Sequence, residues 1–196
     1  MSLPGQRTTT TSMDWDQFRS LISKLERDKE LKFCLLIATG VFTGLRIGDL
    51  LLLKFIQFEE SDILTIQERK TGKQRRIKIN NDLKEIVHRL KTKMDVVDSD
   101  TLMFINKYGT KPIDKSYVNV KLKEIFRTYN IHIDGNISSH MFRKTLGNRV
   151  LKLNNYSNES VILLMELFSH SSPAVTRRYL GIREREILDV YDSLRL

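Results

Sequence analysis

The sequence has few of the residues that build disulfides, and it has no long apolar run. Its 196 residues include one cysteine, Cys34, three prolines and one tryptophan. A single thiol excludes an internal disulfide framework, and its place in the run FCLLIA predicts a small core residue in a reducing compartment. No apolar run approaches the length of a membrane span, and no signal-peptide segment is evident at the start.

The common sequence signatures of metals and nucleotide cofactors are also missing. There is no Cys/His cluster, no HExxH motif and no carboxylate constellation suited to magnesium. A Walker loop and a GxGxxG loop are absent as well. We therefore expect neither a metal ion nor a nucleotide cofactor.

Positive charge is what the sequence has in excess. Lysine and arginine number 33 against 24 acidic residues, which gives a formal charge of +9 and a pI near 9.7. Such a balance favours an anionic partner. Nucleic acid is favoured over a membrane surface, because no strongly basic amphipathic helix with an aromatic-rich apolar face occurs.

Hydrophobic periodicity predicts one mainly helical domain. Residues 1–12 are polar and threonine-rich, and we interpret them as a disordered linker or a cloning remnant outside the fold. Helical spacing is found over residues 13–25, 30–41, 81–94 and 114–129, and strands are predicted at 54–58, 62–70 and 75–79. The predicted fold class is α+β, mainly helical, with a small three-stranded antiparallel sheet in a domain over 13–196.

The stretch ISSHMFRKTLGNRV predicts a helix that carries two candidate functional residues. Ser138 and Ser139 are good N-cap residues. A buried stripe is predicted at Phe142, Leu146, Val150 and Leu153. His140 and Arg143 then share the adjoining face, where both could address one anion near the helix N-terminus. A solvated helix face is the alternative that the pattern leaves open.

The stretch ESVILLMELFSHSSPAVTRRYLG predicts two further helices. The first, over 161–168, is nearly all apolar and is expected to be buried on most sides. His170 follows its end. Ser172 and Pro173 then begin a short helix that Gly181 ends. This helix carries Tyr179, which is either a core or interface residue or a functional phenol.

Two basic features precede this C-terminal region. In TGLRIGDLLLLKF, Arg46 opens a helix with Asp49 one turn along, which predicts either an exposed ion pair or a carboxylate that orients a partly buried guanidinium. In the hairpin that follows, Lys70 shares the parity of Leu64, Ile66 and Glu68, so it should point to their face if the strand extends that far. The hairpin is expected to meet phosphates, and a solvated basic surface is the alternative.

These stretches together resemble a known family. TGLRIGDLLLL, ERKTGKQRR, SSHMFRKT and LFSHSSPAVTRRYLG, in this order, resemble the catalytic domain of tyrosine recombinases of the phage-integrase and Xer type. The resemblance implies catalytic roles for Arg46, Lys70, His140, Arg143, His170 and the nucleophile Tyr179, with Asp49 in support. DNA contacts are expected at Arg69, Lys73, Arg75, Arg76, Lys144, Arg177 and Arg178. Tyr191 is the rival nucleophile, and it lies in no matching motif.

The family resemblance implies metal-free DNA strand cleavage and rejoining through a 3′-phosphotyrosine intermediate. It implies double-stranded DNA as partner and a DNA-bound tetramer, with a monomer possible for the isolated domain. We expect a bacterial, cytoplasmic and nucleoid-associated protein. Its C-terminal tail, residues 183–196, packs either on its own domain or, as the family resemblance implies, on a neighbouring protomer.

The sequence departs from the family pattern in two places. Ser169 stands where the family often has glycine, and the N-terminal core-binding domain is missing from this chain. Three rival functions stay open: type IB topoisomerase-like activity, a metal-free nuclease that uses His140 and His170, and a DNA-binding module without catalysis.

Overall fold

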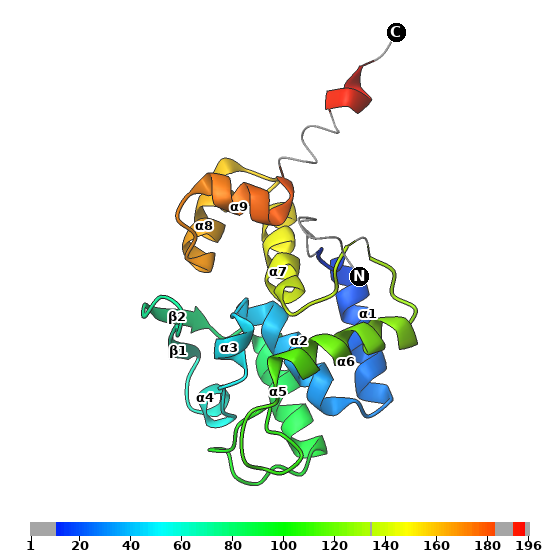
Figure 1. Ribbon diagram of the computed structural model, residues 1–196. Coiled ribbons are helices and arrows are strands. Elements are labelled where there is room, and N and C mark those ends of the chain that lie inside the picture. Colours follow the sequence, from blue (N-terminus) through cyan, green and yellow to red (C-terminus); the bar gives the residue numbers. More distant parts are fainter. Residues whose placement is uncertain (1–10, 134, 183–189, 195–196) are drawn as a thin grey trace.

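The computed structural model describes residues 11–133, 135–182 and 190–194 (Figure 1). Its elements are α1 (Trp15–Arg27), α2 (Leu31–Thr43), α3 (Ile47–Leu50), α4 (Ile56–Glu59), β1 (Ile63–Gln67), β2 (Gln74–Lys78), α5 (Asn81–Lys93), α6 (Lys115–Thr128), α7 (His140–Leu153), α8 (Asn158–Phe168) and α9 (Pro173–Leu180). The mainly helical α+β class is confirmed. Within these residues no helix combines the length and apolar character that crossing a membrane requires.

Side-chain caps fix where the long helices begin. Asp14 and Gln17 form a reciprocal capping box at the start of α1. Asn80 accepts a hydrogen bond from the backbone of α5, and Asp114 does the same for α6. Each cap satisfies backbone N–H groups that have no partner within their own helix. The predicted starts of these three helices consequently lie within two residues of the observed ones, whereas α8 begins three residues before its predicted start.

The sheet has two strands in the described residues, so the prediction of three is wrong. β1 and β2 pair antiparallel, with Ile63 opposite Lys78 and Gln67 opposite Gln74. The predicted first strand, 54–58, is mostly the short helix α4. Phe55 and Phe58 are both buried, and a spacing of three residues puts them on one face of a helix but on opposite faces of a strand.

Two hydrophobic cores share helix α7. The larger core contains α1, α2, α5 and α6, together with Met141 and Phe142 from the first turn of α7. The smaller core contains Leu151 from the last turns of α7, and Phe168 and Leu180 from α8 and α9. Figure 1 shows α8 and α9 beside the upper part of α7, away from the other helices. The N-terminal half of α7 therefore lies at the junction of the two cores.

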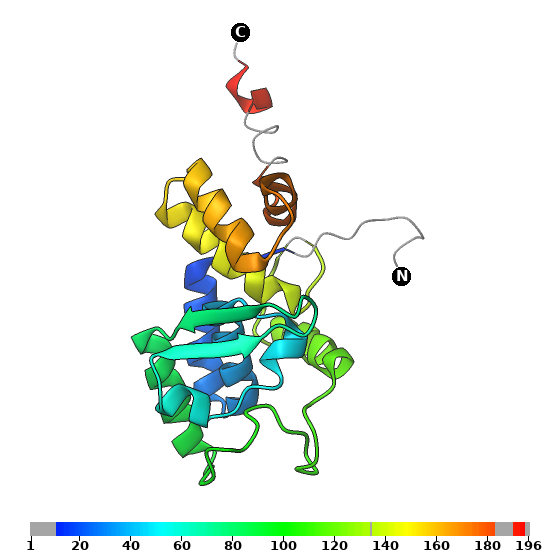
Figure 2. The ribbon, with the colours of Figure 1, turned by 90° about the vertical axis from the view of Figure 1, so that its left-hand side faces the viewer.

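Some apolar residues of the C-terminal helices face solvent, against prediction. Leu153 is 63% exposed, and Leu151 fills the core position instead. Helix α8 was expected to be buried on most sides, but Ile162 and Leu163 are exposed. Among the described helices, α8 packs mainly on α7 and α9, and the face that carries Ile162 and Leu163 is left open to solvent. Figure 2 shows the β1–β2 hairpin in front of the main helices and below α7 and α8.

Candidate active site

Arg143 is the buried centre of the candidate site. It lies one turn into α7 and is 4% exposed. Its Nη1 donates to the carbonyl oxygen of Gly44 at 2.7 Å, and its Nη2 donates to that of Phe168 at 3.0 Å. Burial, aided by the nearby charge of Arg46, lowers the pKa of Arg143 to about 10. The guanidinium is still charged at neutral pH.

Arg46 binds the carbonyl oxygen of Phe168, as Arg143 does, from another part of the chain. Gly44 ends α2 in the left-handed conformation, with φ of 58°, and Arg46 then caps α3. The Nη2 atom of Arg46 donates to Phe168 O at 3.1 Å. Since Phe168 is the last residue of α8, its carbonyl carries part of the negative end of the helix dipole. The end of α8 thus holds two guanidiniums together.

Glu68, which sequence reasoning missed as a functional residue, is the carboxylate bound to Arg46. Its Oε2 accepts from Arg46 Nη1 at 2.7 Å, and its side chain is fully buried. Burial acts to raise the pKa of Glu68, but hydrogen bonds from Arg46 and Thr71 and the charges of Arg46 and Arg75 outweigh it and lower the pKa. The signal for Glu68 was its parity with Leu64 and Ile66, because a carboxylate on a buried face needs a cation.

Asp49 has a different partner from the one that the sequence suggested. The carboxylate that pairs with Arg46 in the described residues is Glu68 and not Asp49. Asp49 is 7% exposed, and its Oδ1 accepts from the backbone N–H of Arg69 at 3.0 Å. The reason is that α3 lies against the hairpin turn. Asp49 therefore fixes the turn that carries Lys70, which is in that turn because β1 ends at Gln67.

One cavity brings together most of the predicted catalytic residues. It has a volume of about 500 Å³ and is lined by Arg46, Ile47, Gly48, Asp49, Arg69, Lys70, Lys115, Ser139, His140 and Arg143. Lys115, at the start of α6, was not predicted to belong to the site. Residues that lie up to 97 positions apart in the chain, Arg46 and Arg143, thus share one opening with an excess of positive charge.

Tyr179 packs against the same cluster from α9. Its Oη donates to the carbonyl oxygen of His140 at 3.3 Å. Its ring lies edge-on to those of His170 and Phe168, with centroids 5.1 and 5.8 Å away, and Lys144 Nζ is 5.3 Å from its centroid. Desolvation raises the pKa of Tyr179, although Arg143 opposes this shift. The phenol is therefore protonated at neutral pH and needs a base to become a nucleophile.

Both histidines are neutral at pH 7. Desolvation, and then the charges of Arg143 and Arg46, lowers the pKa of His170 to about 4. His170 Nδ1 lies 3.0 Å from the hydroxyl of Thr176, which fixes its ring. Desolvation lowers the pKa of His140 as well, with further contributions from Arg143, Lys144, Lys70 and Arg46. A neutral imidazole can accept a proton, so His140 can serve as a base.

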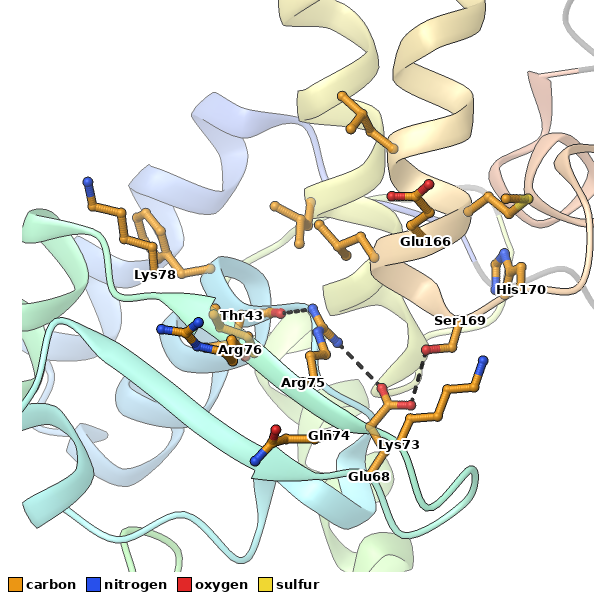
Figure 3. A pocket seen from close by; sticks show the side chains of 16 residues that line it. Thr43, Glu68, Lys73, Gln74, Arg75, Arg76, Lys78, Glu166, Ser169 and His170 are labelled. Carbon is orange, nitrogen blue, oxygen red and sulfur yellow. Dashed lines mark hydrogen bonds and ion pairs between the residues drawn. The ribbon is translucent and has the colours of Figure 1, made fainter.

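A second cavity, of about 790 Å³, lies between the hairpin and α8 (Figure 3). His170 lines this cavity and not the first one. Lys73 and Arg76 also line it and are exposed, as a contact with DNA requires. Arg75 does not fit that expectation, because it turns inward: its Nη2 donates to the carbonyl oxygen of Thr43 at 2.7 Å and its side chain is 12% exposed.

The other predicted DNA contacts lie near the two cavities or on α9. Arg69 lines the first cavity and is exposed. Lys144 covers the ring of Tyr179. Arg178 is exposed and Arg177 is half-buried. In the part of the chain that the structure describes, no group of three or more His, Cys, Asp or Glu side chains could hold a metal ion.

The fold and the site together define a class of protein. They join a mainly helical domain to two arginines, a hairpin lysine, two histidines and a tyrosine. The sequence model of the phage integrase family matches residues 11–186. The chain belongs to the phage integrase family, the tyrosine recombinases that its motifs resemble.

Two curated proteins are similar in sequence. The probable integrase/recombinase YoeC of Bacillus subtilis is 29% identical over 164 residues, which cover 84% of this chain and 82% of YoeC. The tyrosine recombinase XerH of Campylobacter jejuni is 25% identical over 174 residues, which cover 85% of this chain and 47% of XerH. The chain therefore spans most of one relative and about half of the other.

Solved structures share the fold. XerH bound to its palindromic difH substrate, in a post-cleavage complex, matches with a TM-score of 0.68 and 17% identity, over 98% of this chain and 55% of XerH. The XerA recombinase matches with a TM-score of 0.68 and 18% identity, over 96% of this chain and 67% of XerA. A lambda integrase dimer bound to a COC′ core site matches with a TM-score of 0.67 and 16% identity, over 92% of this chain and 50% of the integrase chain.

Proposed function

We propose that this chain is the catalytic domain of a site-specific DNA recombinase that cleaves and rejoins strands through a 3′-phosphotyrosine at Tyr179. The observation that carries the proposal is the single cavity lined by Arg46, Lys70, His140 and Arg143. The phenol of Tyr179 is hydrogen-bonded to the backbone of His140 beside it. Membership of the phage integrase family supports the same reaction class.

The two arginines suit the transition state of phosphoryl transfer. A phosphodiester is already anionic, and attack on phosphorus concentrates more negative charge on its non-bridging oxygens. Guanidiniums offer planar, bidentate donors that stay charged at neutral pH. Arg46 and Arg143 share an anchor on Phe168 O, so they are held in place before substrate binds. Such preorganisation stabilises the transition state more than the ground state.

The remaining residues move the protons. Tyr179 Oη forms a bond to phosphorus and gives its proton to a base, for which His140 is the candidate. The bond between phosphorus and the 5′ oxygen breaks, and that oxygen takes a proton from Lys70 Nζ. A 5′ hydroxyl from a second strand then attacks the phosphotyrosine, and these proton transfers reverse. The phosphotyrosine conserves the energy of the broken bond, so resealing needs no nucleotide.

A covalent trap tests this proposal. The probes are nicked duplexes whose sequences are tiled across the DNA that flanks the gene. Cleavage next to the nick releases a short piece of strand, and its loss prevents resealing, so the adduct accumulates. The full chain should form a protein–DNA adduct that Tyr179→Phe abolishes. Tyr191→Phe is the matched control, because Tyr191 is an exposed tyrosine near the same end of the chain and should leave the adduct unchanged. An adduct that persists in Tyr179→Phe contradicts the proposal.

The same experiment separates the rival functions. Cleaved strands without an adduct indicate a nuclease, and relaxation of supercoiled DNA without strand exchange indicates a topoisomerase-like activity. A DNA-binding module predicts that Arg46→Ala changes only the affinity and its salt dependence.

We also propose double-stranded DNA as the partner and a DNA-bound tetramer as the active assembly, with a cytoplasmic, nucleoid-associated location in a bacterial cell. A DNA partner is supported by the net charge of +9 and by the exposed basic side chains of the hairpin, Lys73 and Arg76. Both curated relatives are bacterial. The predicted docking of the tail lies largely outside the described residues, which include 190–194. Deletion of residues 183–196 should weaken assembly on DNA more than cleavage.

A further inference from the structure

Glu68 joins three segments that carry candidate catalytic residues. Its Oε2 accepts three hydrogen bonds: from Arg46 Nη1 at 2.7 Å, from Thr71 Oγ1 at 2.8 Å and from Ser169 Oγ at 3.2 Å. Its other oxygen, Oε1, lies 3.7 Å from Arg75 Nη1 and is buried without a hydrogen bond. Figure 3 shows the carboxylate between the hairpin and the end of α8. One side chain thus contacts α3, the hairpin and α8.

The charges around Glu68 require a carboxylate. The guanidiniums of Arg46, Arg75 and Arg143 lie close enough for Arg46 and Arg75 to act electrostatically on Arg143. Their other hydrogen-bond acceptors are the neutral carbonyl oxygens of Thr43, Gly44 and Phe168. Among the residues described, Glu68 is the carboxylate that forms ion pairs with this cluster. Without its charge, one buried and two partly buried guanidiniums would lose the carboxylate that is paired with them, which leaves them poorly compensated.

The chain neighbours of Glu68 and Ser169 extend this link to the reacting groups. Lys70 follows Glu68 by two residues in the hairpin turn, and His170 follows Ser169 directly. Ser169 holds a left-handed conformation, with φ of 52°, and its hydroxyl is bonded to Glu68. A family position that is often glycine therefore carries a side chain that binds the carboxylate. This contact therefore joins the segment that carries Lys70 to the segment that carries His170.

We propose that Glu68 is a positioning residue, whose buried carboxylate aims Arg46 at the scissile phosphate and sets the hairpin lysine in register with His170. This inference rests on the proposed function. Glu68 Oε2 and Phe168 O hold one N–H each from the two ends of the Arg46 fork. Fixing both ends sets the plane of the guanidinium, so the remaining N–H groups keep a constant direction. Displacement of a positioning group by about 1 Å lowers a rate by about 100-fold.

The test compares Glu68→Gln with Glu166→Gln. Glu166 lines the second cavity, as Glu68 does, and is exposed. Its side chain has no hydrogen bond or ion pair with Arg46, Arg75 or Arg143, so it is the matched control for loss of one negative charge. Single-turnover adduct formation and the dissociation constant are both measured on the nicked duplex that traps the wild-type protein. Circular dichroism confirms that each variant is folded at the assay temperature.

We expect Glu68→Gln to form the adduct about 100-fold more slowly, with a dissociation constant within about twofold of wild type. Removal of a negative charge beside a phosphate site cannot weaken electrostatic attraction, so a loss confined to the rate is the signature of positioning. Glu166→Gln should match wild type in both quantities. Glu68→Asp keeps the charge and should recover part of the rate.

Two results would overturn the inference: an unchanged rate in Glu68→Gln, or a parallel loss of rate and affinity, which indicates a structural role. If Glu68→Gln is unfolded, Ser169→Ala replaces it, because this variant removes one bond to the carboxylate and leaves the charge in place. It should slow adduct formation with unchanged affinity, and a wild-type rate would count against the inference. Absence of any adduct with wild-type protein would instead refute the proposed function, and the inference with it.

Discussion

Substitution of Gly147 by alanine tests how closely α9 must approach α7 for Tyr179 to act. An alanine Cβ at this position would lie 2.6 Å from Leu180 Cδ2 and 3.2 Å from Phe168 Cε2. Carbon atoms in contact prefer about 3.5 to 4.0 Å, so the Leu180 side chain, and with it the end of α9, would have to give way by up to about 1 Å. Leu180 follows Tyr179 directly on this short helix, and the phenol would move with it.

Two opposing effects determine the stability of this variant. Alanine in a helix interior is favoured over glycine by about 1 kcal/mol. Overpacking of a core lowers the free energy of unfolding by about 1 to 3 kcal/mol. We expect Gly147→Ala to be less stable by about 0 to 2 kcal/mol, while adduct formation slows by about 10- to 100-fold because the nucleophile is displaced.

Urea unfolding and single-turnover adduct formation measure the two quantities. The control is the double variant Gly147→Ala/Leu180→Ala, in which the smaller side chain makes room for the new methyl group. Its loss of stability should be smaller than the sum of the two single losses. A variant Gly147→Ala that is about 1 kcal/mol more stable than wild type and fully active would refute the close packing of α7 and α9.

Three further predictions concern buried groups. Arg75→Ala should lower the free energy of unfolding by about 3 to 5 kcal/mol in urea titrations, because it removes one of the cations paired with the buried Glu68. Arg76 is exposed, so Arg76→Ala should keep the stability of the wild type. It should bind DNA more weakly, with an affinity that depends less on salt concentration. Burial lowers the pKa of His170 from 6.5 to about 4, so the unfolded state binds more protons and stability should fall as pH drops through this window. His170→Gln should remove at most about 3 kcal/mol of this decline, and an identical pH dependence in both proteins would contradict the burial of the ring. Burial raises the pKa of Cys34 to about 12, so a thiol reagent at pH 8 should label the unfolded chain and not the native one.

Four of the candidate site residues were expected to lie together because they occur in short motifs in a fixed order. Arg46, Lys70, His140 and Arg143 line one cavity as expected, although each of these residues taken alone had a structural alternative. The caps and breakers near them are local signals, and Ser172, Pro173 and Gly181 bound α9 as predicted. Local hydrogen bonding decides such boundaries, and local sequence therefore reveals them.

The predictions failed where a distant partner decides the outcome. Glu68 binds Arg46 across 22 residues and Ser169 across 101, and no local spacing specifies either contact. Asp49 is the closer carboxylate in sequence, but the fold directs it to the backbone of Arg69. Ile162 and Leu163 belong to an apolar run that periodicity assigns to a core, and only the packing of α8 shows which side of it is covered.

The acceptor that Arg46 and Arg143 share is a peptide oxygen at the end of α8, and this has a consequence for how the protein can change. Replacing the side chain of Phe168 does not remove that backbone oxygen, so a point mutation there leaves the acceptor of both arginines in place. An inserted or deleted residue in α8 would instead rotate the terminal carbonyl by about 100° and shift it by about 1.5 Å. Over evolution, the length of this helix should therefore vary far less than its composition.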